Sequence, residues 1–178
     1  MPSDPVSASK FMSLVLRHRP DTIGIELDPK GWVPVAELVK KSDGTLTDAL
    51  VRQIVCDSDK HRFALSEDGR DIRANQGHSV NVDLGLLPSD PPATLDHGTA
   101  TRFLASIRAE GLRPGNRQFV HLSPDAETAT KVGQRHGKPV VLTIDAGGMV
   151  CDGMVLLLSR NGIWLTKAVP ARYISSDD

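Results

Sequence analysis

Arginine and histidine recur in short polar motifs along the chain, and both side chains can bind phosphate. Arg17 and His18 stand in "LRHRP", Arg73 stands in "IRANQGHS", and Arg135 stands in "VGQRHGKP". An arginine guanidinium stays protonated at physiological pH and presents a planar fork that matches phosphate oxygens. Histidine can also exchange a proton near neutral pH. These four side chains are therefore candidates for holding and processing a phosphate group.

Each of these motifs also has a plainer explanation. Arg17 and His18 are expected in the last turn of a helix, where the helix dipole stabilises a cation by about 0.3–1 kcal/mol. Arg73 alone would be an ordinary solvated residue of a strand, and Arg135 would be one basic residue of a surface loop. The residues that follow Arg73 favour an anion site, because they form a run of hydrogen-bonding groups: Gln76, His78 and Ser79.

Two further motifs, "DHGT" (96–99) and "VHLS" (120–123), each place a histidine in or beside a strand with a hydroxyl group two residues later. Either motif alone could arise by chance, but two in one small domain are more informative. Ser123 and Pro124 are also typical of a helix start. Free backbone N–H groups at such a start bind phosphate readily.

The elements that position the first motifs are three helices followed by a β-hairpin. A helix with an apolar stripe of Phe11, Leu14 and Val15 is expected to end before Pro20. Pro34 suits the first turn of a second helix, and Thr47 can cap a third. Short strands "RFAL" and "DIRA" surround an Asp-Gly turn. This is the element order of a winged helix, ending near residue 79.

The second half has a different pattern and predicts an α+β domain rich in strands. A helix over 101–110 is expected to end at Gly111, and strands are expected at "QFVHL", "PVVLTIDA", "MVLLLS" and "IWLT", with an edge strand in "AVPARYI". Residues 80–95 contain three prolines and predict a linker. The expected domains are therefore a winged-helix-like lobe over 1–79, a linker over 80–95 and a second lobe over 96–178.

Bulk properties exclude several classes of protein. The 178 residues carry 21 Lys and Arg against 22 Asp and Glu, and this balance argues against a broad basic footprint for nucleic acid. Cys56 and Cys151 lie far apart, so a zinc site or a disulfide framework is not expected and a reducing cytoplasm is the default. There is no signal-peptide pattern and no apolar run long enough for a bilayer. We expect a cytoplasmic protein with no membrane segment and no metal site.

The sequence also lacks common catalytic fingerprints. It has no G-x-G-x-x-G, no P-loop lysine motif, no H-E-x-x-H and no G-x-S-x-G. Its acidic residues show no arrangement that suggests paired catalytic carboxylates.

Taken in order, "SKFMSLVLRHRP", "GWVPVAEL", "IRANQGHS", "DHGT", "VHLS", "VGQRHGKPVVL" and "NGIWLTKAVPARYI" resemble the RNA 2′-phosphotransferase family of the KptA type. The resemblance covers nearly the whole chain. It implies an α+β protein with an N-terminal winged-helix lobe of three helices plus a β-hairpin, followed by a strand-rich lobe like that of ADP-ribosyltransferases. That second lobe would bind NAD without the G-x-G-x-x-G motif.

The implied activity is that of a transferase with NAD as co-substrate and an RNA bearing an internal 2′-phosphate as partner, such as a tRNA splice junction. The products would be a 2′-hydroxyl, nicotinamide and ADP-ribose 1″,2″-cyclic phosphate. The resemblance implies no membrane partner and no obligatory protein partner. The residues that match the family's catalytic set are Arg17, His18, Arg73 and Arg135. Those that match its NAD-binding strands are His97, Gly98, Thr99, His121, Leu122 and Ser123. Substrate binding is expected from Arg17, His18, Arg73, Gln76, His78 and Ser79, within a site that both lobes complete.

The chain departs from the family at Asp96, because an aromatic residue, often Tyr, usually precedes His-Gly-Thr there. Two other functions stay open: ADP-ribosyl transfer to a terminal phosphate of a nucleic acid, and a winged-helix or RNA-binding protein without enzymatic activity. Duplex DNA binding is disfavoured because the expected third helix, "TDALVRQIVCDSD", has one arginine among several aspartates. Transfer to protein is disfavoured because no glutamate follows Glu127.

Overall fold

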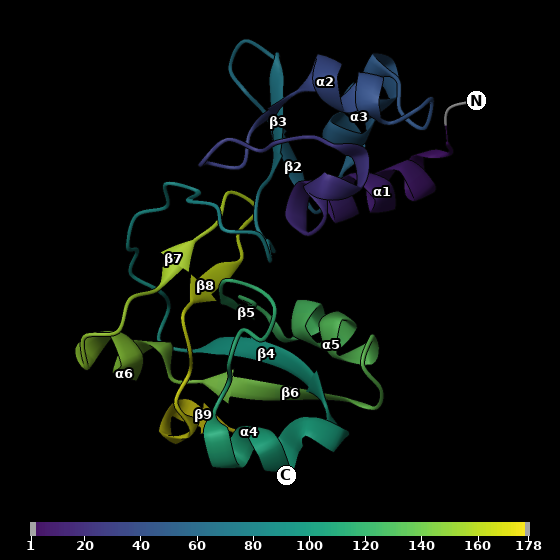
Figure 1. Ribbon diagram of the computed structural model, residues 1–178. Coiled ribbons are helices and arrows are strands. Elements are labelled where there is room, and N and C mark those ends of the chain that lie inside the picture. Colours follow the sequence, from purple (N-terminus) through teal and green to yellow (C-terminus); the bar gives the residue numbers. More distant parts are fainter. Residues whose placement is uncertain (1–2, 177–178) are drawn as a thin grey trace. The chain divides into compact units, whose positions relative to one another are not determined.

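The computed structural model describes residues 3–176, and the chain divides into two compact units between Gly85 and Leu86 (Figure 1). Each unit has its own hydrophobic core. Both units combine helices with small antiparallel sheets, so the predicted α+β class is confirmed. The division falls inside the segment 80–95 that the sequence assigns to a linker.

Unit 1 contains three α-helices and a three-stranded antiparallel sheet in the order β1-β3-β2. Its elements are α1 (Pro5–Arg17), the 3-10 helix η1 (Pro20–Ile23), β1 (Val33–Pro34), α2 (Val35–Lys41), α3 (Asp48–Asp57), β2 (Phe63–Leu65) and β3 (Asp71–Ala74). The expected hairpin is present, with Phe63 opposite Ala74 and Leu65 opposite Ile72. The sequence did not predict β1, which is only two residues long and pairs Val33 with Ile72.

Helix α1 turns most of the predicted stripe to the core. Its buried residues are Ala8, Met12, Val15 and Leu16, and Phe11 packs partly buried against the same core. The prediction was wrong only for Leu14, which is 44% exposed, because the apolar arc runs through Met12 and Leu16 instead. The carboxylate of Asp4 caps the first turn by accepting from the backbone N–H groups of Val6 and Ser7.

Unit 2 contains two three-stranded antiparallel sheets, in the orders β4-β6-β9 and β5-β8-β7. Its elements are β4 (Leu95–Ala100), η2 (Thr101–Phe103), α4 (Leu104–Glu110), β5 (Val120–Leu122), α5 (Ala126–Gln134), β6 (Pro139–Ile144), α6 (Ala146–Cys151), β7 (Leu157–Leu158), β8 (Trp164–Thr166), η3 (Ala171–Tyr173) and β9 (Ile174–Ser175). The expected turn at Gly111 is confirmed, with the helix before it starting as a 3-10 turn. Helix α6 was not predicted. No helix among residues 3–176 is both long and apolar enough to cross a bilayer.

Helix α5 packs directly on β4 and β6, and two glycines make the close approach feasible. A Cβ atom built on Gly98 of β4 would fall on the carbonyl oxygen of Ala129 in α5. A Cβ atom on Gly133 of α5 would lie 2.5 Å from the carbonyl oxygen of Thr99. Backbone therefore meets backbone here, and no side chain larger than hydrogen fits at either position.

We expect Gly98→Ala to lower the free energy of unfolding by about 3 kcal/mol, because the added methyl group must push a helix backbone off a strand. Chemical denaturation of the purified variant measures this. Gly147→Ala is the matched control, since a Cβ atom there would meet Ala93 at an ordinary 3.5 Å. The control should change stability by less than about 0.5 kcal/mol. Equal effects of the two substitutions would contradict the backbone contact.

Candidate functional site

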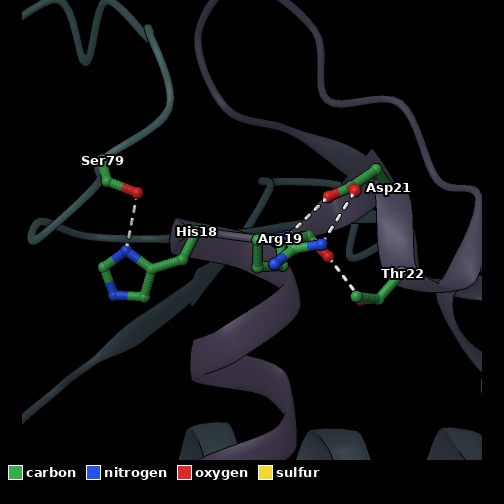
Figure 2. Close-up of polar contacts among 5 residues, drawn as sticks. All are labelled: His18, Arg19, Asp21, Thr22 and Ser79. Carbon is green, nitrogen blue, oxygen red and sulfur yellow. Dashed lines mark hydrogen bonds and ion pairs between the residues drawn. The ribbon is translucent and has the colours of Figure 1, made fainter.

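The end of α1 and the segment after β3 form one structure in unit 1. The backbone N–H groups of Ser79 and Val80 both donate to the carbonyl oxygen of Arg17, at 2.9 and 3.2 Å. The hydroxyl oxygen of Ser79 lies 2.9 Å from Nδ1 of His18, as Figure 2 shows. The two motifs that the sequence singled out in this unit therefore lie in direct contact.

Figure 2 also shows that His18 and its neighbour Arg19 contact different residues. Arg19 forms an ion pair with Asp21, and its carbonyl oxygen accepts a hydrogen bond from the hydroxyl of Thr22. Arg19 is thus occupied in holding the turn after α1. His18, which follows the last helical residue, is directed to the segment after β3 instead of to the core.

Arg17 lies against this segment at Gly77, where a Cβ atom would meet Cδ, Nε and Cζ of Arg17 at an ordinary contact distance of 3.5 Å each. The φ of Gly77 is +90°, in the left-handed region. The Gln-Gly-His turn therefore needs a glycine for its backbone conformation.

Arg73 is held by two contacts on the exposed side of β3. Ile72 and Ala74 are fully buried, so Arg73 points to the opposite face, as the alternation of the sequence predicted. Its guanidinium carbon lies 4.5 Å from the ring centre of Trp32, and its Nη1 donates to the carbonyl oxygen of Lys30 at 3.3 Å. Stacking on an aromatic ring fixes an arginine without neutralising its charge.

His78 lies among these cations. Only 2% of its surface is exposed. Burial, followed by the charges of Arg17, His18 and Arg73, lowers the pKa of His78 to about 4. The ring is therefore neutral at pH 7, and Arg17, His18 and Arg73 are close enough for their charges to act on it.

Four buried polar atoms of the same segment have no hydrogen-bond partner within residues 3–176. They are both ring nitrogens of His78, Oε1 of Gln76 and Oδ1 of Asn75. Buried polar atoms are normally satisfied, and exceptions indicate a role in binding or catalysis. Asn75 differs, because its Nδ2 donates to the carbonyl oxygen of His61 at 2.6 Å and ties the segment to the rest of unit 1.

An open groove of about 620 Å³ borders the site of unit 1 and runs along 20–28 and 80–82. Val80, whose backbone N–H donates to the carbonyl oxygen of Arg17, contributes to its lining. Asp21, Glu26 and Asp28 also line the groove, and their carboxylates disfavour a phosphate group within it.

The depressed pKa of His78 predicts a loss of stability in mild acid. The folded-state pKa lies below the ordinary value of 6.5, so the unfolded chain takes up a proton first as the pH falls. The contribution is complete above about pH 6.5 and is lost progressively toward pH 4. Between pH 7 and pH 4.5, the free energy of unfolding of unit 1 should fall by about 2 kcal/mol more in the wild type than in His78→Gln.

Urea unfolding followed by Trp32 fluorescence in a Trp164→Phe background measures this difference. Subtracting the His78→Gln curve removes the carboxylates that titrate in the same range. Parallel losses of stability in both proteins would show that His78 is not held neutral by its surroundings.

In unit 2 the two histidine motifs meet at the junction of β4 and β5. Asp96 and Ser123 exchange backbone hydrogen bonds of 2.9 and 2.7 Å. Nδ1 of His97 lies 2.9 Å from the carbonyl oxygen of His121. Because a carbonyl oxygen can only accept, Nδ1 carries the proton and Nε2 of neutral His97 is an acceptor.

The surroundings of His97 favour that neutral form. Burial lowers the pKa of His97, the backbone hydrogen bond to His121 raises it, and the charge of His136 lowers it further. Leu122, Thr99 and Ser123 beside it are buried, the last two at 6% and 7% exposure. The junction therefore combines an imidazole acceptor with two shielded hydroxyl groups.

Ser123 does not begin a helix, and this prediction was wrong. Helix α5 begins three residues later, and the carboxylate of Asp125 accepts from the backbone N–H of Thr128 at 2.7 Å. Asp125 thus satisfies the helix start with a negative charge, which disfavours a phosphate at that point. Ser123 belongs to the strand junction instead.

Arg135 follows the last residue of α5 and is exposed. Its charge acts on Arg117, a residue of the loop before β5 that the sequence did not single out. Although Arg117 as a whole is exposed, packing around its charged end and then the charge of Arg135 lower the pKa of Arg117. The local sequence "PGNRQ" does not predict that Arg117 lies near Arg135, because their proximity depends on how two loops meet.

Within residues 3–176 no group of three or more His, Cys, Asp and Glu side chains is placed to hold a metal ion. The chemistry of both groups of residues is that of cations, imidazoles and hydroxyls.

Comparisons with known proteins agree with the order of these motifs. A sequence model described as RNA 2′-phosphotransferase, Tpt1/KptA family, matches residues 3–168. The chain is 59% identical to a "Probable RNA 2'-phosphotransferase" of Agrobacterium fabrum over 172 residues, which are 95% of this chain and 92% of that protein. It is 55% identical over 170 residues to a protein of the same name from Acaryochloris marina, with 94% of each covered. A Burkholderia pseudomallei protein of that name is 52% identical over 170 residues.

Proposed function

The chain belongs to the RNA 2′-phosphotransferase family, Tpt1/KptA, and is a transferase. We propose that it removes an internal 2′-phosphate from RNA, such as that at a tRNA splice junction, with NAD as co-substrate. The RNA would be ADP-ribosylated on its 2′-phosphate and then released with a 2′-hydroxyl. Nicotinamide and ADP-ribose 1″,2″-cyclic phosphate would be the other products.

The observation that carries this proposal is the convergence of Arg17, His18 and Arg73 around neutral His78 in unit 1. A phosphomonoester carries about −1.5 to −2 charges at pH 7, and guanidinium groups that never deprotonate suit it. The hydrogen bond between His18 and Ser79 and the stacking of Arg73 on Trp32 fix two of these side chains before substrate arrives. Preorganised donors of this kind stabilise developing charge most effectively.

His18 is proposed to position the phosphate and to transfer a proton where one is needed. Arginine cannot exchange protons at neutral pH, whereas an imidazole can. Gln76, His78 and Ser79 would complete the binding of the phosphate oxygens or of the neighbouring ribose. The buried Oε1 of Gln76 can only accept a hydrogen bond and therefore suits a ribose hydroxyl, whereas the protonated ring nitrogen of neutral His78 can donate to a phosphate oxygen; both groups lack partners within residues 3–176.

The junction of β4 and β5 fits a ribose of NAD. Nε2 of His97 is free of its own hydrogen and can accept one from a ribose hydroxyl, while Thr99 and Ser123 offer shielded hydroxyl groups. Gly98 keeps α5 close to the strand, and His121 orients His97 through its carbonyl oxygen. NAD, when bound, would supply a sugar carbon, C1″, whose nicotinamide leaves as a neutral molecule. Arg135 would then contact the negatively charged groups of the reactants.

We further propose that unit 1 is a winged helix and that unit 2 has an ADP-ribosyltransferase-like fold. The succession of α1, β1, α2, α3, β2 and β3, with three antiparallel strands, supports the first assignment. Two small antiparallel sheets with one helix packed on β4 and β6 support the second. Transfer of ADP-ribose to a terminal phosphate is the second candidate, because the same residues would hold such a phosphate.

Incubation of the protein with NAD and an oligonucleotide that carries one internal 2′-phosphate tests the proposal. The expected products are the oligonucleotide with a 2′-hydroxyl and ADP-ribose cyclic phosphate, both identified by mass spectrometry. A 5′-phosphorylated oligonucleotide in a parallel reaction tests the second candidate. Conversion of neither oligonucleotide, with NAD left intact, would exclude both functions.

Arg73→Ala should slow the second step more than the first. Its guanidinium would contact the transferring phosphoryl oxygens as the ribose 2″-hydroxyl attacks phosphorus, and loss of one such donor typically costs about 10²–10³ in rate. Single-turnover reactions with labelled 2′-phosphorylated RNA should therefore accumulate ADP-ribosylated RNA. Arg70→Ala is the matched control on the same hairpin, because Arg70 is solvated and pairs only loosely with Asp68. Equal slowing of both steps would remove the assigned role of Arg73.

A further inference from the structure

An exposed aromatic ring in unit 2 lies against an arginine and a histidine that the proposed chemistry does not use. Phe103 is 38% exposed. The guanidinium carbon of Arg102 lies 4.6 Å from the centre of its ring. The ring of His136 meets it edge-on, with 6.3 Å between ring centres and 76° between ring planes. We call Arg102, Phe103, His136 and Lys138 the Phe103 platform.

The paired ends of β4 and β6 hold the platform together. Ala100, the last residue of β4, lies opposite Pro139, the first residue of β6. The backbone N–H of Thr101 donates to the carbonyl oxygen of Lys138 at 3.0 Å. The segment that carries Arg102 and Phe103 therefore begins beside the segment that carries His136 and Lys138, because β4 and β6 are paired at these ends. This strand pairing helps to fix the distance between the two segments.

The positive charge of this surface is not neutralised by neighbouring carboxylates. Among residues 3–176, none of Arg102, Arg135 and Lys138 forms an ion pair. Arg135 immediately precedes His136, and its charge also acts on Arg117. In a chain with a net charge of −1, such a concentration of cations is a local feature and not a consequence of composition.

We propose that the Phe103 platform binds single-stranded RNA, with one base stacked on Phe103 and the adjacent phosphates held by Arg102 and Lys138. Exposed aromatic rings among basic residues are the usual means of binding single strands, because every base has a face that can stack. This inference rests on the proposed function only in taking RNA as the substrate. It adds to unit 2 a binding surface for RNA nucleotides, next to Arg135.

The exposure of the platform favours RNA over the dinucleotide, whose ribose is assigned to the junction of β4 and β5. The hydroxyls at that junction are shielded, whereas Phe103 and Arg102 are exposed. An open surface of this kind suits a strand that continues past the site on the protein.

Fluorescence anisotropy with a labelled 12-nucleotide RNA that lacks a 2′-phosphate tests the surface without NAD or turnover. Phe103→Ala should weaken binding about tenfold, within the range that loss of one base–aromatic stack produces. Phe103→Trp should retain affinity. Leu158→Ala is the matched control, because Leu158 is equally exposed, at 39%, on β7. The double change Arg102→Gln and Lys138→Gln should lower the slope of log affinity against log salt by about 1.4, or about 0.7 for each cation.

Unchanged RNA affinity in Phe103→Ala, or equal losses in Phe103→Ala and Leu158→Ala, would overturn the proposal. Weaker NAD binding by calorimetry with unchanged RNA affinity would assign the ring to the dinucleotide and would also overturn it. If Phe103→Ala fails to fold by circular dichroism, Phe103→Leu decides, because it keeps bulk and removes the aromatic face. If the wild-type protein transfers phosphate but these variants bind RNA normally, the platform alone is refuted. If RNA binding depends on the platform but no phosphate is transferred, the proposed function alone is refuted.

Discussion

Positive charge gathered around one desolvated imidazole is the constraint on which unit 1 depends. Arg17, His18 and Arg73 all disfavour a proton on His78, and burial disfavours it further. Because guanidinium groups keep their charge, Arg17 and Arg73 would also stabilise an anion that came close to them.

Unit 2 places its polar groups by backbone packing. Gly98 and Gly133 bring α5 onto β4 without intervening side chains, and this contact fixes the strand that carries His97. His97 is then oriented by a backbone carbonyl and not by a side chain. The geometry of the junction consequently depends on the missing side chains of these two glycines as much as on the groups that would touch a ligand. A substitution at Gly98 would disturb ligand binding even if the backbone of that residue never met a ligand.

The residues with candidate chemistry could be found from the sequence because arginine, histidine and glycine motifs are local. The hairpin of unit 1 and the cap at Thr47 followed from turn and capping chemistry. The start of α5 was misplaced because Ser123-Pro124 and Asp125 both resemble caps, and only the pairing of Ser123 with Asp96 decides between them. Arg117 and the Phe103 platform could not be predicted, since both arise where segments distant in sequence meet. Local patterns thus identify side chains, whereas their neighbours depend on tertiary contacts.

Asp96 illustrates how far the junction in unit 2 is independent of side-chain identity. It stands where the family usually has an aromatic residue, yet its contribution to the β4–β5 junction is made by its backbone N–H and carbonyl groups. Any residue except proline could form those two hydrogen bonds. Burial, and then the charge of Asp125, raise the pKa of Asp96, so the substitution brings a second carboxylate near an existing one. The departure therefore changes the charge beside His97 while the strand pairing that positions the imidazole stays intact.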